Sequence, residues 1–283
     1  MKVDLDCFPC FLKQALIALR LGTKDSTLQE RILKSVIEEV VHADTSRPPA
    51  HTTTFIHRKI RELLKADPFV GIKSEYNQSA LRLFHALKDI VASSKDPLWT
   101  AARLAIAGNV IDFGIFTSVN IEGTVEKALE QTIAIDDYAF FREAVSGSEE
   151  VFYLLDNAGE IVFDRILIET MQSKGVHVVA VVKGSPVIND CTIGDAVESG
   201  LMDVCEVIDN GSDAVGTILE LTSEEFKERC ARIPLVISKG QANFETFQDR
   251  GKEIYYLFQS KCEVLSRELG LPIGAMLLKK SGD

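Results

Sequence analysis

The chain has 283 residues, of which 46% are hydrophobic and 26% charged, as is typical of a soluble globular protein with one large or two modest domains. Its formal net charge of −11 argues against nucleic acid or an anionic membrane surface as a main partner. It has no apolar run of membrane-spanning length, no recognisable signal peptide and six cysteines without a disulfide framework, which together predict a cytoplasmic protein.

The first half of the chain has the apolar spacing of amphipathic helices. Ser26 and Gln29 form a candidate capping box for the second helix. Residues 44–53, which include Pro48 and Pro49, are predicted as a loop, and no strand is predicted before Val151. The predicted helices cover residues 8–21, 26–41, 55–65, 76–91, 98–107, 124–134 and 137–145.

From Val151 onwards, short runs rich in Val, Ile and aromatic residues alternate with helical patterns. This alternation predicts a mainly parallel sheet with helices on both faces. The composition changes near Ser146, so we predict a mainly helical domain over residues 1–147 and an α/β domain over 148–283. The predicted strands cover residues 151–155, 177–182, 204–208, 235–238 and 254–258, and helices are predicted at 161–173 and 223–231.

Polar residues gather after the predicted strands, at the edge where open parallel sheets bind ligands. Asp156, Asn157 and Glu160 follow the first strand, and Asp190 follows the second. An Asp, Asn, Asp set of oxygen donors suits Mg²⁺ or Mn²⁺ better than Zn²⁺. The alternatives are an Asx turn that caps the helix after Asp156 and a helix N-cap role for Asp190. We expect Asp156, Asn157 and Asp190 to hold a divalent cation.

A glycine-containing turn follows the fourth predicted strand, with the sequence Lys239-Gly240-Gln241-Ala242-Asn243. Its N–H groups and its lysine could hold a phosphate, although the spacing is not that of a Walker loop. The alternative is an ordinary strand-to-helix turn. Lys183 and Lys261 also follow strands and could add positive charge, but a lysine at a strand end is more often a solvated surface residue.

Two further motifs lie in the helical half. Asn109 and Asp112 are three residues apart, so they share a face of a helix or tight turn, and the alternative is a helix end. Cys7 and Cys10 begin the first predicted helix. A redox role normally needs a strand before such a pair, and a zinc site needs two more soft ligands. Metal binding and a structural role both stay open for this pair.

Together, Asp156-Asn157-Ala158-Gly159-Glu160, Asn189-Asp190-x-Thr192 and the Lys239–Asn243 turn resemble motifs of the damage-control phosphatase family, the metal-dependent phosphatases long called domain of unknown function 89. The resemblance runs nearly end to end. Gly108-Asn109-x-x-Asp112 is similar to the helical-domain motif of that family. Cys7-x-x-Cys10 resembles the signature of a subfamily with an N-terminal cysteine pair.

The resemblance implies an N-terminal helical domain packed on a Rossmann-like three-layer α/β domain that carries the metal site. It implies a divalent metal held by Asp156, Asn157 and Asp190, and substrates that are sugar phosphates or damaged cofactor phosphates. It also implies substrate contacts from the turn residues and from a lysine whose surrounding motif is Arg-Thr-x-Lys in another subfamily. In this chain Gln259 and Ser260 replace Arg-Thr, so that subfamily's substrate is not carried over. The implied substrate contacts are Lys239, Gly240, Gln241, Asn243 and Lys261.

We therefore expect metal-dependent hydrolysis of small phosphomonoesters, with Mn, Mg, Co or Ni as the metal. Lys239 and Lys261 would offset charge on the phosphoryl oxygens, while Asn109 and Asp112 would reach substrate hydroxyls. The nucleophile is open between Asp156 and water, with water favoured, and Glu160 or Asp190 would act as base or lie in the outer shell of the metal.

Two other classes of protein stay open. A nucleotide-cofactor enzyme such as a methyltransferase would fit the alternation of strands and helices, but no G-x-G-x-x-G follows the first strand. A non-catalytic metabolite-binding protein is the second alternative. The sequence does not determine the oligomeric state.

Overall fold

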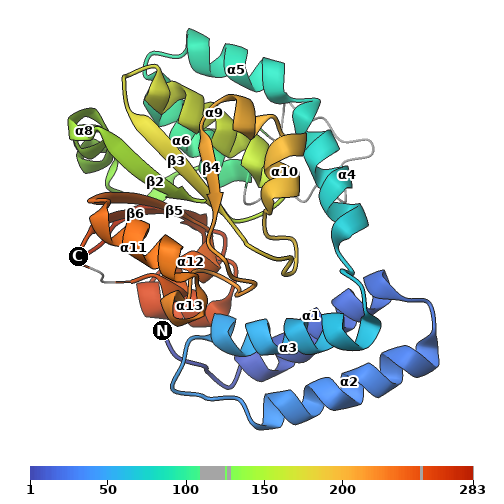
Figure 1. Ribbon diagram of the computed structural model, residues 1–283. Coiled ribbons are helices and arrows are strands. Elements are labelled where there is room, and N and C mark those ends of the chain that lie inside the picture. Colours follow the sequence, from blue (N-terminus) through green and yellow to red (C-terminus); the bar gives the residue numbers. More distant parts are fainter. Residues whose placement is uncertain (109–124, 126–128, 249–250, 283) are drawn as a thin grey trace.

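The computed structural model describes residues 1–108, 125, 129–248 and 251–282. Its N-terminal helices form a unit with its own core, at the lower right of Figure 1. Phe11, Leu19 and Ile56 are among the residues buried there. Within the described residues, no helix is long and apolar enough to cross a membrane. The helices of this unit are α1 (Cys7–Gly22), α2 (Ser26–Val41) and α3 (Pro49–Leu64).

Two details at the ends of these helices differ from the sequence prediction. The side chain of Asp25, rather than the predicted Ser26, caps α2 by accepting hydrogen bonds from the N–H groups of Thr27 and Leu28. Helix α3 begins at Pro49, inside the segment predicted as a loop. Proline is favoured at the first position of a helix because its missing N–H has no intrahelical partner there. The Pro48-Pro49 pair therefore begins a helix.

A seven-stranded sheet forms the centre of the molecule, in the order β1-β7-β6-β5-β2-β3-β4. Among the strands of the described residues, β6 and β7 form the one antiparallel pair. Strands β3 and β4 follow β2 on one side of it, and β5 pairs with the other side of β2. The strands are β1 (Ile133–Asp136), β2 (Glu150–Leu154), β3 (His177–Val182), β4 (Glu206–Asp209), β5 (Leu235–Lys239), β6 (Glu253–Gln259) and β7 (Met276–Lys280).

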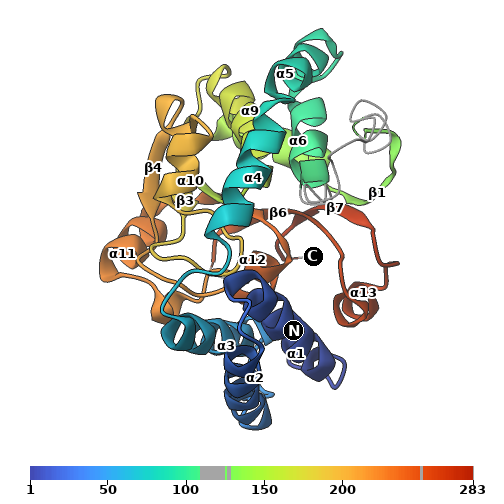
Figure 2. The same cartoon turned by 90° about the vertical axis from the view of Figure 1, so that its right-hand side faces the viewer.

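Helices cover both faces of the sheet, as Figure 2 shows. Alternate strand residues point to opposite faces, so Tyr153 is buried on one side of β2 and Phe152 on the other. The side of Tyr153 is covered by α5 (Phe84–Ser93), α6 (Pro97–Gly108), α8 (Tyr138–Gly147), α9 (Glu160–Gln172) and α10 (Ile193–Glu198). The side of Phe152 is covered by α11 (Glu224–Arg232), α12 (Gln241–Thr246) and α13 (Glu263–Leu269).

These layers confirm the predicted α/β class with a mainly parallel sheet, and they correct several element predictions. Strand β1 occupies the end of a segment predicted as helix, and β7 was not predicted. Both strands lie at one end of the sheet, where β1 pairs with β7 alone. The helix predicted over 76–91 is two helices, α4 (Val70–Leu81) and α5. Because β1 precedes residue 147, the sheet contains strands from both sides of the predicted domain boundary.

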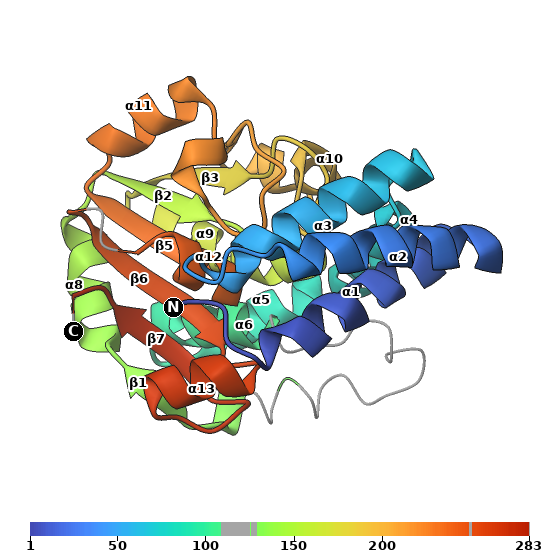
Figure 3. The same cartoon turned by 90° about the horizontal axis from the view of Figure 1, so that it is seen from below.

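Helix α4 connects the α1–α3 unit to the main body of the molecule (Figure 1). It contacts α9 and α10, the helices that follow β2 and β3. The α1–α3 unit extends away from the body in the view of Figure 3, while α3 contacts α12. The segments after β2, β3 and β5 therefore have helices of the N-terminal half beside them.

Candidate active site

The turn between β2 and α9 is tied to the loop after β3 by main-chain hydrogen bonds. The N–H of Cys191 donates to the carbonyl oxygen of Asp156, and the N–H of Ala158 donates to that of Asn189, both at 2.8 Å. Asn157 and Asp190 form an isolated antiparallel bridge. The structure therefore brings the three predicted metal ligands, Asp156, Asn157 and Asp190, into adjacent positions.

The alternative capping roles of the two acids do not match the structure. Helix α9 has Gly159 as its N-cap, with no capping side chain, and the φ of Gly159 is 77°. Helix α10 is capped by Thr192, which forms a capping box with Asp195. Neither Asp156 nor Asp190 is needed to begin its helix. Their positions at two neighbouring strand ends need another explanation.

Both acids are buried, which disfavours their charged forms. Burial, together with the negative charges of Glu160 and Asp190, raises the pKa of Asp156 to about 8. Burial also raises the pKa of Asp190, while the ammonium groups of Lys183 and Lys73 act in the opposite direction. The two carboxyl groups thus lie where additional positive charge would stabilise them.

The donor types suit a hard divalent cation. Asp156 and Asp190 offer carboxylate oxygens and Asn157 an amide oxygen. The Asn157 amide nitrogen donates to Asp156 Oδ2 at 2.5 Å and to Glu160 Oε2 at 3.1 Å, which orients this side chain. Among the described residues, no three His, Cys, Asp or Glu side chains could hold a metal ion by themselves. A cation between the two acids would need Asn157 or water to complete its ligands.

Gly240 lies directly against the carboxyl group of Asp156. Its φ of 81° and ψ of 159° belong to a region that only glycine occupies readily. A Cβ atom at this position would lie 2.7 Å from Asp156 Oδ1 and closer still to Oδ2. The backbone therefore comes very close to a neighbouring group at this glycine, and that group is the carboxyl of Asp156. The N–H of Gly240 donates to the carbonyl oxygen of Leu257 at 3.2 Å, so this donor belongs to the sheet.

Lys239 is fully buried and pairs with two carboxylates. Its Nζ lies 2.5 Å from Glu160 Oε1 and 2.6 Å from Asp164 Oδ1, and donates to the carbonyl oxygen of Ala105 at 2.8 Å. Burial lowers the pKa of Lys239, but the negative charges of Asp164 and Glu160 outweigh burial and raise it above its usual value. The ammonium group lies beneath the site, where it supports Glu160, rather than facing a substrate as predicted.

Asp164 was not identified from the sequence. It is fully buried, its Oδ1 also accepts a hydrogen bond from the Tyr153 hydroxyl at 2.7 Å, and burial raises its pKa to about 7. The signal was present in the sequence as one acid within the apolar face of the 161–173 helix. A buried acid of this kind needs a partner, and Lys239 is that partner.

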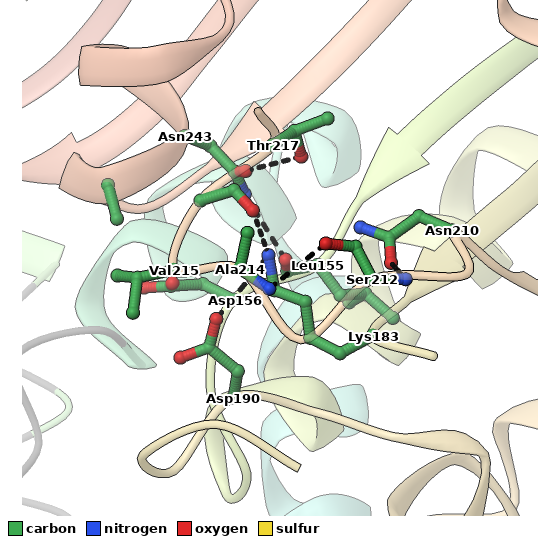
Figure 4. A network of polar contacts seen from close by, with 12 residues as sticks. Leu155, Asp156, Lys183, Asp190, Asn210, Ser212, Ala214, Val215, Thr217 and Asn243 are labelled. Carbon is green, nitrogen blue, oxygen red and sulfur yellow. Dashed lines mark hydrogen bonds and ion pairs between the residues drawn. The ribbon is translucent and has the colours of Figure 1, made fainter. Parts of the chain in front are cut away.

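Lys183 is also buried, with 4% of its side chain exposed, although a strand-end lysine is more often solvated. Its Nζ lies 3.5 Å from Asp190 Oδ2 and donates to the carbonyl oxygen of Gly216 (Figure 4). Figure 4 also shows Asn210, whose Oδ1 accepts hydrogen bonds from the N–H groups of Gly184 and Ser212. Lys183 therefore connects a predicted metal ligand to the loop after β4.

Asn243 and Lys261, which were also predicted to contact substrate, differ in exposure. Asn243 is buried, and its Nδ2 donates to the carbonyl oxygens of Leu155 at 3.2 Å and Lys239 at 2.8 Å, which ties the ends of β2 and β5 together. Lys261 is exposed, its positive charge lowers the pKa of Asp156, and its N–H donates to Gln241 Oε1 at 3.2 Å. Lys261 is thus an exposed cation whose charge acts on Asp156.

Asn109 and Asp112 lie outside the described residues, so their predicted contacts stay predictions. All six cysteines are free thiols. Cys7 is buried and burial raises the pKa of its thiol, whereas Cys10 is exposed. The structure gives no metal ligand set for this pair among the described residues.

Comparison with known proteins identifies the family of this chain. The family model described as "Damage-control phosphatase ARMT1-like domain" matches residues 3–277. A damage-control phosphatase of Archaeoglobus fulgidus is 32% identical over 287 residues, and one of Pyrococcus horikoshii is 32% identical over 286 residues; each alignment covers 99% of both chains. The crystal structure of a DUF89 family protein from Pyrococcus horikoshii is similar with a TM-score of 0.91, at 32% identity and 99% coverage of both chains. The chain therefore belongs to the damage-control phosphatase family with the ARMT1-like domain.

Proposed function

We propose that this protein is a divalent-metal-dependent phosphatase that hydrolyses small phosphorylated metabolites, either sugar phosphates or damaged cofactor phosphates. The supporting observation is the pair of buried acids, Asp156 just after β2 and Asp190 in the loop after the neighbouring strand β3, which main-chain hydrogen bonds hold together. Burial and mutual repulsion raise the pKa of Asp156, and a divalent cation is a partner that offsets both effects. The damage-control phosphatases similar to this chain support the reaction type.

Asp156, Asn157 and Asp190 would hold the cation. When bound, a divalent cation supplies Lewis-acid polarisation of a phosphoryl oxygen. Lys261 would meet the phosphate of the substrate, because it is an exposed cation whose charge acts on Asp156. Lys239 would act through Glu160, which it holds at 2.5 Å beneath the site.

We retain water as the nucleophile. Glu160 is engaged by Lys239 and Asn157, so we assign it the role of orienting the Asn157 amide. Asp190 Oδ2 forms an ion pair with Lys183 Nζ at 3.5 Å and has no shorter hydrogen bond from the described residues. Asp190 would receive the proton of the attacking water through this oxygen.

The test is a screen for phosphate release on sugar phosphates and cofactor phosphates, with Mg²⁺, Mn²⁺, Co²⁺ and Ni²⁺ supplied separately. Asp156→Ala is expected to remove metal-stimulated hydrolysis while the fold remains intact by circular dichroism. Asp209→Asn is the matched control, because Asp209 is an exposed acid at the end of the neighbouring strand β4. Full activity in Asp156→Ala, or activity that a chelator does not reduce, would contradict the proposal.

The same preparation separates the two alternative classes. Stabilisation by S-adenosylmethionine or a dinucleotide, with no response to divalent metals, would identify a nucleotide-cofactor enzyme. Stabilisation by phosphorylated metabolites without phosphate release across the panel would identify a binding protein.

A further inference from the structure

A single side chain of α4, Asn77, contacts the segments after both acid-bearing strands. Asn77 is fully buried, and its Oδ1 accepts a hydrogen bond from the N–H of Gly159 at 2.7 Å. Its Nδ2 donates to Asp195 Oδ1 at 3.1 Å and to Glu198 Oε2 at 2.8 Å. One amide group therefore joins the turn that begins at Asp156 to helix α10, which follows Asp190.

Lys73 lies four residues before Asn77, on the same face of α4. Its Nζ is 2.6 Å from Asp195 Oδ2, and both side chains are buried. Asp195 Oδ2 also accepts hydrogen bonds from the N–H and the hydroxyl of Thr192, each at 2.8 Å. Lys73 therefore anchors the first turn of α10, which begins three residues after Asp190.

We propose that Asn77 and Lys73 are positioning residues that hold the Asp156 turn and the Asp190 loop in register for metal binding. The inference rests on the proposed metal-dependent function. Side chains that orient the ligands of a metal typically contribute 10–100-fold to its affinity. The Asp156 turn needs such support because it contains Gly159, a residue with a positive φ and wide conformational freedom.

Helix α4 also links these contacts to the α1–α3 unit. It is the helix that connects the α1–α3 unit to the main body (Figure 1). A displacement of α4 would move the acceptor of the Gly159 N–H and the partners of Asp195 together. The distance between Asp156 and Asp190 therefore depends on the position of α4 against α9 and α10.

Asn77→Ala is the first variant, and Gln78→Ala is its matched control. Gln78 is the next residue of α4 and is exposed. Its side chain donates to Glu198 Oε1 at 2.9 Å and makes no hydrogen bond to Gly159 or Asp195. Both variants lose a hydrogen bond to Glu198. Binding of Mn²⁺ to the full chain is measured by isothermal titration calorimetry without substrate. We expect at least about a tenfold weaker Kd in Asn77→Ala and an unchanged Kd in Gln78→Ala.

Lys73→Met is the second variant, and it decides the question if Asn77→Ala does not fold. It removes the ion pair to Asp195 and leaves the Asn77 contacts in place, and we expect it to weaken Mn²⁺ binding as well. Amide hydrogen exchange of segments 155–161 and 189–196 is the second measurement. Faster exchange there in Asn77→Ala and in Lys73→Met, and not in Gln78→Ala, is the expected result.

The two measurements separate this inference from the proposed function. If the wild-type chain binds no divalent metal, the proposed metal site is wrong. Amide exchange alone then tests whether Asn77 and Lys73 hold the two segments in place. A folded Asn77→Ala or Lys73→Met variant with wild-type Mn²⁺ affinity, or with wild-type exchange in both segments when no metal binds, would overturn the positioning role.

Discussion

Replacement of Gly240 by alanine tests the contact between the end of β5 and Asp156. The added Cβ would lie 2.7 Å from Asp156 Oδ1 and closer still to Oδ2, where real Cβ contacts are at least 3.0 Å. The carboxyl group must then retreat by roughly 1 Å, a displacement that can reduce activity by about 100-fold. The backbone conformation of Gly240 adds on the order of 1–3 kcal/mol of strain for any other residue.

Gly270→Ala is the control for replacing a glycine of positive φ without a steric clash. Gly270 also has a positive φ, of 66°, but its Cβ would meet no atom within 4 Å. We expect Gly270→Ala to cost about 1–2 kcal/mol of unfolding free energy, and Gly240→Ala to cost more. Urea denaturation gives the free energies, and a Mn²⁺ titration reports the position of Asp156. Equal destabilisation in the two variants, together with unchanged Mn²⁺ affinity in Gly240→Ala, would refute the steric reasoning.

Three further changes have expected outcomes. Lys239→Met should lower the unfolding free energy by about 3–5 kcal/mol, because Glu160 and Asp164 stay buried without their cation; an added Asp164→Asn should restore part of it in urea denaturation. Glu245 has a pKa raised by burial from 4.5 to about 7, so wild-type stability falls as the pH rises between these values. Glu245→Gln should therefore increase the free energy of unfolding at pH 8 by up to about 3 kcal/mol, seen as a higher Tm, and leave it unchanged at pH 4. An equal gain in Tm at the two pH values would contradict the raised pKa of Glu245. Asp213→Asn weakens the contacts of this acid with two arginines of α3 and should cost about 1–3 kcal/mol in urea denaturation, whereas wild-type stability would show that these contacts are dispensable.

The strand-end acids could be predicted because two simple regularities place them. Short apolar runs that alternate with helical patterns indicate a parallel sheet, and its strand ends collect ligand-binding residues. Asp156 follows its run within two residues and Asp190 lies in the loop after the next run, so both belong to the same edge of the sheet. The same reasoning could not find β1, a four-residue strand with one β-branched pair, Ile133 and Ile135, at the end of a helical pattern.

The environment of the lysines could not be predicted from local sequence. A lysine after a strand has the same neighbours in the chain whether its ammonium is solvated or buried. Lys239 is buried because Asp164 and Glu160 meet it from positions 75 and 79 residues earlier in the chain. Lys183 is buried because Gly216 and Asp190 receive its ammonium group. Asn77 was missed for the same reason, since its contacts lie 82 or more residues away.

The buried group of Lys239, Glu160 and Asp164 restricts how this site can vary between homologous proteins. Loss of the lysine leaves two buried acids without their cation, and loss of either acid leaves the ammonium group with one fewer counter-charge in a fully buried position. A single-step change at any of the three is therefore more damaging than a joint replacement. We expect these three positions to covary across the family, changing together where they change, even in members whose substrate-facing residues have diverged.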